Sequence, residues 1–375
     1  VPHLQQLYRV PQQPWLAMAN FTRLVWITVV AVLLPLLMVL AMWTSVTSDV
    51  RSESENLPRF DGWIQDENRI AILMAGSLQR FNLNTNLERL VSPLVRENWT
   101  VDLYLSIRMG KVQGWRQAAD AFEPEGELKN LNQEGLETLL TWKVSQFGGT
   151  LVYQHIFDEI DLAVEDIDFI QNSTFFGHSA RAIVAKRNFL LLWKELHKLW
   201  YNAQAQEDLM GSYSYVMILR EDSYWFQDFQ LQKLLQTGGR QRVSGYNGNL
   251  FSLLCDSRYT RGGDLRGLID YVFLLDRRGA KTMCNVYTHI TRPASQGKSW
   301  FESYRQDYII GVGSELLYLH MVKHFNVAVT EVPMSLMPMQ RVARFHGQLC
   351  LHKYCDAKLA SKNLPYFHPD MPLCK

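Results

Sequence analysis

Three charged residues, Arg220, Glu221 and Asp222, follow directly after the apolar run at 213–219. In an open α/β sheet, ligands bind beyond the carboxyl ends of the strands, so charged residues in this place are the first candidates for a binding site. The two carboxylates could hold a divalent cation, and the arginine could contact phosphate oxygens. An ordinary solvated surface turn would have the same local composition.

A second candidate is the turn at 75–80, Ala-Gly-Ser-Leu-Gln-Arg, which follows another apolar run. Gly76 permits close approach of the backbone to a ligand, and Arg80 can meet a phosphate group. The turn lacks the three-glycine spacing of a dinucleotide-binding fingerprint and the Gly-Lys-Ser/Thr of a nucleoside triphosphatase loop. It is therefore a weak signal for phosphate binding.

Glu315 lies at the start of a predicted helix at 314–324. A carboxylate in the first turn is stabilised by the helix dipole, so an N-terminal capping role is the simplest interpretation. A general base that deprotonates a hydroxyl group would need the same residue type in a cleft. The sequence leaves both roles open.

The five cysteines all lie in the last third of the chain. Cys350 and Cys355, with His346 and His352, suggest a metal site, but their spacing fits no standard zinc pattern. A disulfide that holds the C-terminal tail is the preferred interpretation. Because the number of cysteines is odd, at least one is unpaired or bonded to another chain.

Apolar runs and helical patterns alternate along the chain. The strands and helices that they predict must position the candidate residues. This alternation predicts an α/β domain with a mostly parallel sheet. The helix at 179–201 has aromatic and aliphatic residues at helical spacing, and we expect them to form core. The predicted strands are 69–76, 100–107, 149–156, 213–219, 271–280 and 326–334, and the other predicted helices are 85–97 and 314–324.

The stretch at 24–43 carries no charged residue and is long enough to span a bilayer core of about 30 Å. Arg9 and Arg23 precede it, which places the N-terminus in the cytosol by the positive-inside rule. A cleaved signal peptide is the alternative, but the run is longer than a usual signal core. We expect a cytosolic tail at 1–23, a transmembrane helix at 24–43, a stem at 44–67 and a lumenal domain at 68–375.

Two acceptor triplets for N-glycosylation, at Asn98 and Asn172, agree with a lumenal domain. The 38 basic residues nearly cancel the 37 acidic ones, so no global positive field exists to attract nucleic acid. We therefore expect no nucleic-acid partner and expect membrane attachment only through the N-terminal helix.

Four segments in order resemble a group of Golgi-type, GT-A-like glycosyltransferases that act in polysaccharide and glycan synthesis. The segments are IAILMAGSLQRF at 70–81 with the later Val-Asp-Leu-Tyr at 101–104, YSYVMILREDSYWF at 213–226, DYVFLLDRRGA at 270–280, and 314–317 through 326–329. The second segment resembles a strand that ends in Arg-x-Asp, where other members of the group have Asp-x-Asp.

The resemblance implies a GT-A-like sheet flanked by helices, and a single-pass type II Golgi membrane enzyme that moves a sugar from a nucleotide-sugar donor to a glycan or glycoprotein hydroxyl. It places Gly76, Arg80, Arg220, Glu221 and Asp222 at the donor. It assigns Asp270 and Glu315 to the acceptor side, with Glu315 as the better candidate for the base.

The resemblance also implies Mn²⁺ or Mg²⁺ as cofactor, with Asp222 and His346 as ligands. The departure from Asp-x-Asp leaves metal-independent binding through basic side chains open. Two other functions fit the same features less well. One is a catalytically inactive, lectin-like or scaffold protein of the same fold, and the other is a lumenal sulfotransferase, for which the turn at 75–80 is a poor phosphosulfate loop.

Overall fold

The computed structural model describes residues 68–110, 122–158, 162–172, 179–237, 245–253, 271–291, 314–345 and 348–353. All of them belong to one compact unit, Asp66–Lys375. The predicted span at 24–43 lies outside the described residues. Within the described ranges, no helix combines the length and the apolar character needed to cross a bilayer.

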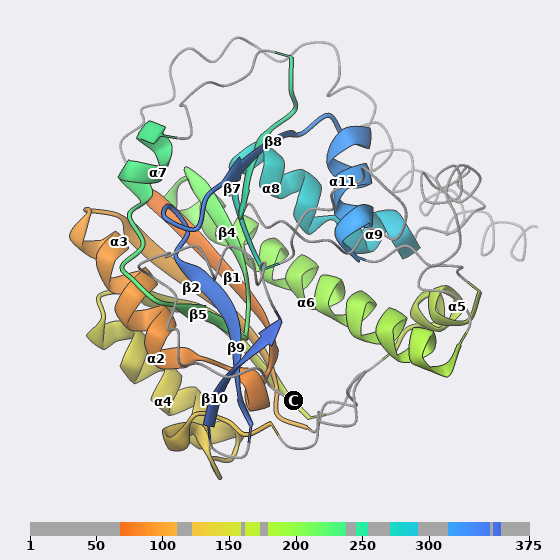
Figure 1. Cartoon of the computed structure of the whole chain (residues 1–375), viewed down its shortest axis with the longest axis horizontal. Helices are drawn as coiled ribbons and strands as arrows, with labels where there is room; N and C mark the ends of the chain where they lie inside the picture. The colour runs from red at the N-terminus through yellow and green to blue at the C-terminus, as the bar shows by residue number, and fades with distance from the viewer. Residues whose placement is uncertain are drawn as a thin grey trace, which may run out of the picture. The chain divides into compact units, whose positions relative to one another are not determined.

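The main sheet has seven strands in the order β3-β2-β1-β4-β7-β6-β8. Figure 1 labels β2, β1, β4, β7 and β8 of this sheet. β7 runs antiparallel to both of its neighbours, and the other pairs are parallel. The predicted α/β fold with a mostly parallel sheet is therefore confirmed. The strands are β1 (Arg69–Ser77), β2 (Thr100–Arg108), β3 (Thr150–Phe157), β4 (Tyr215–Arg220), β6 (Asn249–Leu253), β7 (Val272–Asp276) and β8 (Ala328–Val332).

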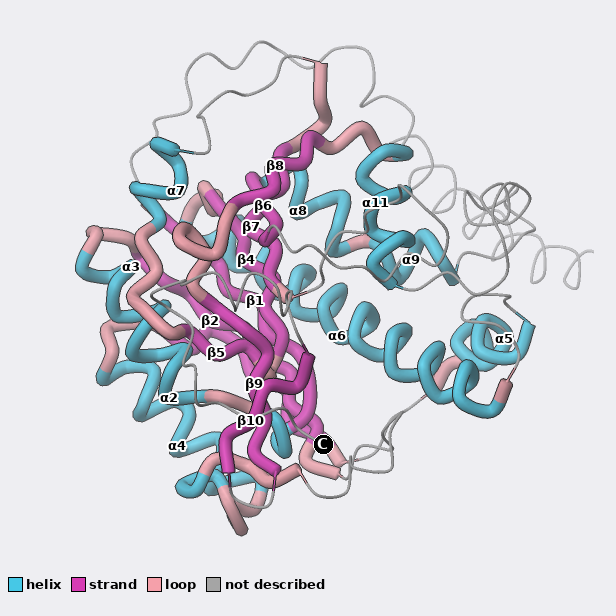
Figure 2. Tube along the Cα trace, viewed as in Figure 1, coloured by secondary structure: helices cyan, strands magenta, loops and turns pink. Residues whose placement is uncertain are grey.

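Helices cover both faces of this sheet (Figure 2). One face packs on α2 (Leu83–Asn86), the π-helical turn Leu87–Val91, α3 (Ser92–Arg96), α4 (Gln133–Gln146) and α7 (Leu231–Thr237). The other packs on α6 (Ala180–Met210), α8 (Arg277–Cys284), α9 (Val286–Thr291) and α11 (Ser314–His324), with α5 (Val164–Asn172) against α6. Among the described residues, η1 (Leu78–Arg80) and η4 (Gly126–Leu128) are short 3₁₀ helices.

Strand β1 has strands on both sides and is continuously apolar from Ile70 to Ala75. Ile70, Ile72 and Met74 belong to the core on the α3 side, whereas Ala71 and Leu73 belong to the core on the α6 side. A strand that is covered on both faces needs apolar residues at every position rather than at alternate ones. The carboxyl end of β1, Ser77, lies at the edge where the candidate site lies.

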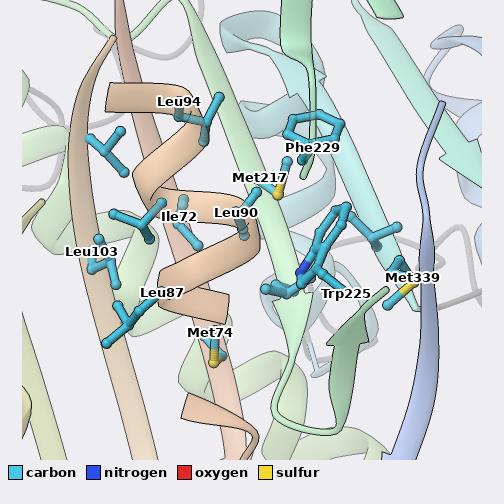
Figure 3. Close-up of a cluster of buried hydrophobic side chains, with 14 of the residues drawn as sticks. Ile72, Met74, Leu87, Leu90, Leu94, Leu103, Met217, Trp225, Phe229 and Met339 are labelled. Carbon is cyan, nitrogen blue, oxygen red and sulfur yellow. The ribbon is translucent and has the colours of Figure 1, made fainter. Parts of the chain in front are cut away.

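A smaller antiparallel sheet has the order β10-β9-β5. It consists of β5 (Ser223–Trp225), β9 (Met339–Phe345) and β10 (Gln348–Lys353). Trp225 of β5 and Met339 of β9 are buried in the same core as Leu90, as Figure 3 shows. Because β5 starts immediately after Asp222, the candidate residues 220–222 connect the two sheets.

The segment at 271–280 differs from the prediction of a single strand. The strand ends at Asp276, whose side chain accepts a hydrogen bond from the backbone N–H of Gly279 at 2.7 Å and so caps α8. The aromatic and aliphatic residues of α6, by contrast, are core as predicted, with Trp193 and Trp200 each 1% exposed.

Two cysteines, Cys284 and Cys350, lie among the described residues; whether a disulfide holds the C-terminal tail stays a prediction. Cys350 is disulfide-bonded, so it cannot supply a thiolate to a metal. Cys284 is free and buried, which accounts for one unpaired cysteine, and burial raises the pKa of its thiol.

Candidate functional site

The site lies where the strand order of the main sheet reverses. β1 has β2 on one side and β4 on the other, so the chain winds in opposite directions from β1. In open α/β sheets, ligands bind in the crevice outside the carboxyl ends of the strands at such a point. The register pairs Ser77 with Arg108 and Ala75 with Arg220, so the ends of β1, β2 and β4 bring their charged residues to one edge.

Asp222 is the centre of this edge and is fully buried. Its Oδ2 accepts hydrogen bonds from Nε and Nη2 of Arg341 at 2.9 and 2.6 Å. Its Oδ1 accepts one from Nε of Arg220 at 3.2 Å, and Nη1 of Arg80 lies 3.5 Å from Oδ2. Burial alone would raise the pKa of Asp222, but the three guanidinium groups outweigh it and hold the pKa well below its usual range.

Glu221 is also buried, and its carboxylate forms an ion pair with Nη2 of Arg80. A Cβ atom on Gly76 would lie 2.2 Å from the carboxyl carbon of Glu221. The glycine therefore makes room for this carboxylate. Gly76 and Arg80, predicted to belong to the site, thus contact the 220–222 turn directly.

Backbone hydrogen bonds hold the turn from two sides. The N–H of Asn82 donates to the carbonyl of Glu221 at 3.1 Å, and the N–H of Val342 donates to the carbonyl of Asp222 at 2.8 Å. The side-chain amide of Asn82 also donates to the carbonyl of Val342 at 2.8 Å. The turn is therefore a fixed part of the fold and not a solvated surface loop.

A divalent cation does not fit Asp222 in this arrangement. Both oxygens of Asp222 already accept hydrogen bonds from arginines, and a metal would have to displace them. His346, the other predicted metal ligand, lies outside the described residues. Among the residues that the structure describes, no group of three His, Cys, Asp or Glu side chains could hold a metal ion.

The remaining predicted residues are only partly placed. Glu315 is the second residue of α11, but its side chain is not described, and Asp270 lies outside the described residues. Asn98 is exposed in the turn before β2, and Asn172 is the last residue of α5. Their roles, including glycosylation, stay predictions.

Sequence reasoning did not identify Arg341 or Arg108 as residues of the site. Arg341 lies on β9, more than a hundred residues from Asp222, and no local pattern marks it. Arg108 is the last residue of β2, directly after an apolar run. The rule that identified Arg220, a charged residue at the end of an apolar strand, would have found Arg108 as well.

The sequence matches no family model and no curated protein. Solved structures with some likeness include mouse xyloside xylosyltransferase 1, with 13% identity, a TM-score of 0.37, and coverage of 71% of this chain and 86% of that one. The glycosyltransferase GlyE of Streptococcus pneumoniae has 13% identity and a TM-score of 0.31, with coverage of 70% and 45%. A nucleoside-diphosphate-sugar pyrophosphorylase of Vibrio cholerae has 11% identity and a TM-score of 0.32, with coverage of 74% and 95%. Since these three TM-scores are below 0.5, the likenesses assign neither a family nor an activity.

Proposed function

We propose that this protein is a glycosyltransferase that moves a sugar from a nucleotide-sugar donor to a hydroxyl of a glycan or glycoprotein. The observation that carries the proposal is the Arg220-Glu221-Asp222 turn at the strand-order reversal, held against Gly76 and Arg80. These are the residues that the resemblance to GT-A-like glycosyltransferases assigns to the donor. The proposal includes a type II Golgi membrane location, with the domain after the stem in the lumen.

The chemistry needs positive charge where the leaving group develops negative charge. The acceptor oxygen bonds to the anomeric carbon, the bond from that carbon to the diphosphate oxygen breaks, and the nucleoside diphosphate leaves with the electron pair. Guanidinium groups fixed at the site would stabilise this charge. Within the proposal, Glu315 takes the proton of the acceptor hydroxyl, and Asp270 lies on the acceptor side.

The test is a donor screen on the full chain. Nucleotide sugars with uridine, guanosine and cytidine carriers are added singly, and the melting temperature and the release of the free nucleotide are measured, with and without glycan acceptors. A ligand that binds only the folded state raises the melting temperature. We expect one carrier class to stabilise the protein and to be turned over; no stabilisation by any donor would overturn the proposal.

Two variants test the roles proposed for Glu315 and Arg80. Glu315→Gln should keep donor binding and reduce transfer by about 100-fold or more, as expected for loss of a general base. Arg80→Gln should weaken donor binding. The control is Arg278→Gln, because Arg278 is exposed near the start of α8, at the opposite edge of the sheet.

The second candidate function is that of a catalytically inactive binding protein. The observation that favours it is that Asp222 forms ion pairs with three arginines in place of a metal ion. In the same screen it would show donor stabilisation without nucleotide release. Turnover that Glu315→Gln abolishes would exclude it.

A further inference from the structure

Two arginines, Arg108 and Arg187, form no ion pair with another described residue. Arg108 lies near the charges of Glu221, Arg80 and Arg187. Arg108 ends β2, in register between Ser77 of β1 and Phe157 of β3. Arg187 lies in the amino-terminal third of α6, the helix that packs on β1 and β2. Both side chains are partly buried, so neither is an ordinary surface arginine.

The carboxyl edge as described has more positive than negative charge. Its guanidinium groups belong to Arg80, Arg108, Arg187, Arg220 and Arg341, whereas its buried carboxylates are Glu221 and Asp222. Both carboxylates are already engaged by arginines other than Arg108 and Arg187.

The surplus charge is unfavourable in the free protein. Burial, and then the nearby charges of Arg187 and Arg80, lower the pKa of Arg108, while Glu221 only partly opposes them. A lowered pKa means that folding disfavours the charged form of Arg108. Unfavourable arrangements of this kind are often retained because a function needs them.

Hydrogen-bond donors without a partner also favour a ligand at this edge. The Nε atoms of Arg80 and Arg187 are buried without a hydrogen-bond partner. Most buried polar groups in proteins have partners, so each exception calls for an explanation. An anion with several oxygens would accept from these donors.

We propose that Arg80, Arg108 and Arg187 form an anion site that binds the diphosphate of a nucleoside diphosphate without a divalent cation. Guanidinium groups suit this task because their planar, forked donors match phosphate oxygens. Asp222 then has a positioning role: it holds Arg80 and Arg220 at the edge and contacts no ligand. The identity of the ligand rests on the proposed function, whereas the anion site rests on the arginines.

The experiment measures binding of inorganic pyrophosphate, uridine diphosphate and guanosine diphosphate to the full chain by calorimetry, once in EDTA and once with Mn²⁺. We expect pyrophosphate and one nucleoside diphosphate to bind in EDTA, with an affinity that falls as salt rises. Binding that requires Mn²⁺ would overturn the proposal.

The variants Arg108→Gln and Arg187→Gln should each weaken pyrophosphate binding by about 10-fold or more, as expected for loss of a hydrogen bond to a charged group. The melting temperature of free Arg108→Gln should be unchanged or higher than that of the wild type, because the change removes a like-charge contact. A purely structural arginine would give a lower melting temperature. Arg278→Gln should change neither quantity.

The outcomes separate this proposal from the proposed function. Unchanged pyrophosphate affinity in both variants would overturn the anion site, even if the protein transfers sugar. Metal-free binding that the variants weaken, without turnover of any nucleotide sugar, would support the anion site and overturn the glycosyltransferase.

Discussion

The two ends of β1 each hold a buried arginine site, and the two sites are built differently. At the amino end, Nη1 of Arg69 donates to the carbonyls of Met210 and Gly211 at 2.7 and 2.5 Å, and Nη2 donates to Asp102 at 2.6 Å. Tyr213 donates to the same carboxylate at 2.7 Å, and its ring lies under the guanidinium group. One positive charge thus meets one negative charge.

At the carboxyl end, several guanidinium groups surround two carboxylates, and Arg108 and Arg187 are left without an ion pair among the described residues. Burying a charge costs several kcal/mol unless it is paired and hydrogen-bonded. At the amino end, groups of the chain itself pair the buried charge, as expected for a site that serves folding. At the carboxyl end, part of the buried positive charge is left to be paired by a ligand.

The largest effect is expected for Asp222→Ala. Removal of the carboxylate leaves Arg341, Arg220 and Arg80 close together, and the free energy of unfolding should fall by about 5 kcal/mol. Asp228→Ala is the matched control in a urea denaturation series, because Asp228 also binds two arginines, Arg89 and Arg96, but at the surface. The control should lose about 1 kcal/mol or less. Equal losses in both variants would contradict the role of Asp222 as a buried anchor.

Asp102→Ala should cost less, about 3 kcal/mol, because Arg69 keeps its two carbonyl acceptors. In contrast to changes at the carboxyl end, it should leave pyrophosphate affinity unchanged at temperatures where the protein is folded. Denaturation and calorimetry on the same sample measure both quantities. A loss of anion affinity would show that the two ends are not independent.

Gly76→Ala should destabilise the protein by about 2 kcal/mol, because the new methyl group overlaps the carboxylate of Glu221 and forces it away from Arg80. The control is Gly126→Ala, where an added Cβ meets nothing within 4 Å, and its effect should stay within about 0.5 kcal/mol. Thermal melting compares the two. If both variants melt at the wild-type temperature, the close approach at Gly76 is unimportant.

The smallest effect concerns pH. The pKa of Asp222 is depressed in the folded protein, so its contribution to stability is present above the unfolded pKa of about 3.9 and is lost as pH falls toward the folded value. The stability difference between wild type and Asp222→Asn should therefore shrink below about pH 4, by at most about 1.4 kcal/mol per pH unit. Urea denaturation at a series of pH values measures it. If the stability difference grew on acidification, the pKa of Asp222 would be raised in the folded protein rather than depressed.

The sequence predicted the elements whose pattern is local. β1 and β2 were recognisable as continuous apolar runs, and α6 by its helical spacing. The antiparallel direction of β7 depends on which strands it pairs with, and no local pattern encodes that. β5 is only three residues long, and β9 pairs with it across more than a hundred residues.

The same distinction between local and non-local features holds for the candidate site. Arg220, Glu221 and Asp222 could be predicted, because a strand end that carries charge is visible in the sequence. Their chemical state could not, because it depends on Arg341, which only the folded chain brings to Asp222. The predicted metal ligand was therefore found in contact with arginines.

Asp222 shares its carboxylate with arginines from three separate segments, η1, the end of β4 and β9. This sharing has an evolutionary consequence. A change of charge at any one of these positions alters the balance at the others, so a single substitution is poorly tolerated unless a second one accompanies it. In related sequences, Arg80, Arg220, Asp222 and Arg341 should therefore be inherited, or replaced, as a set.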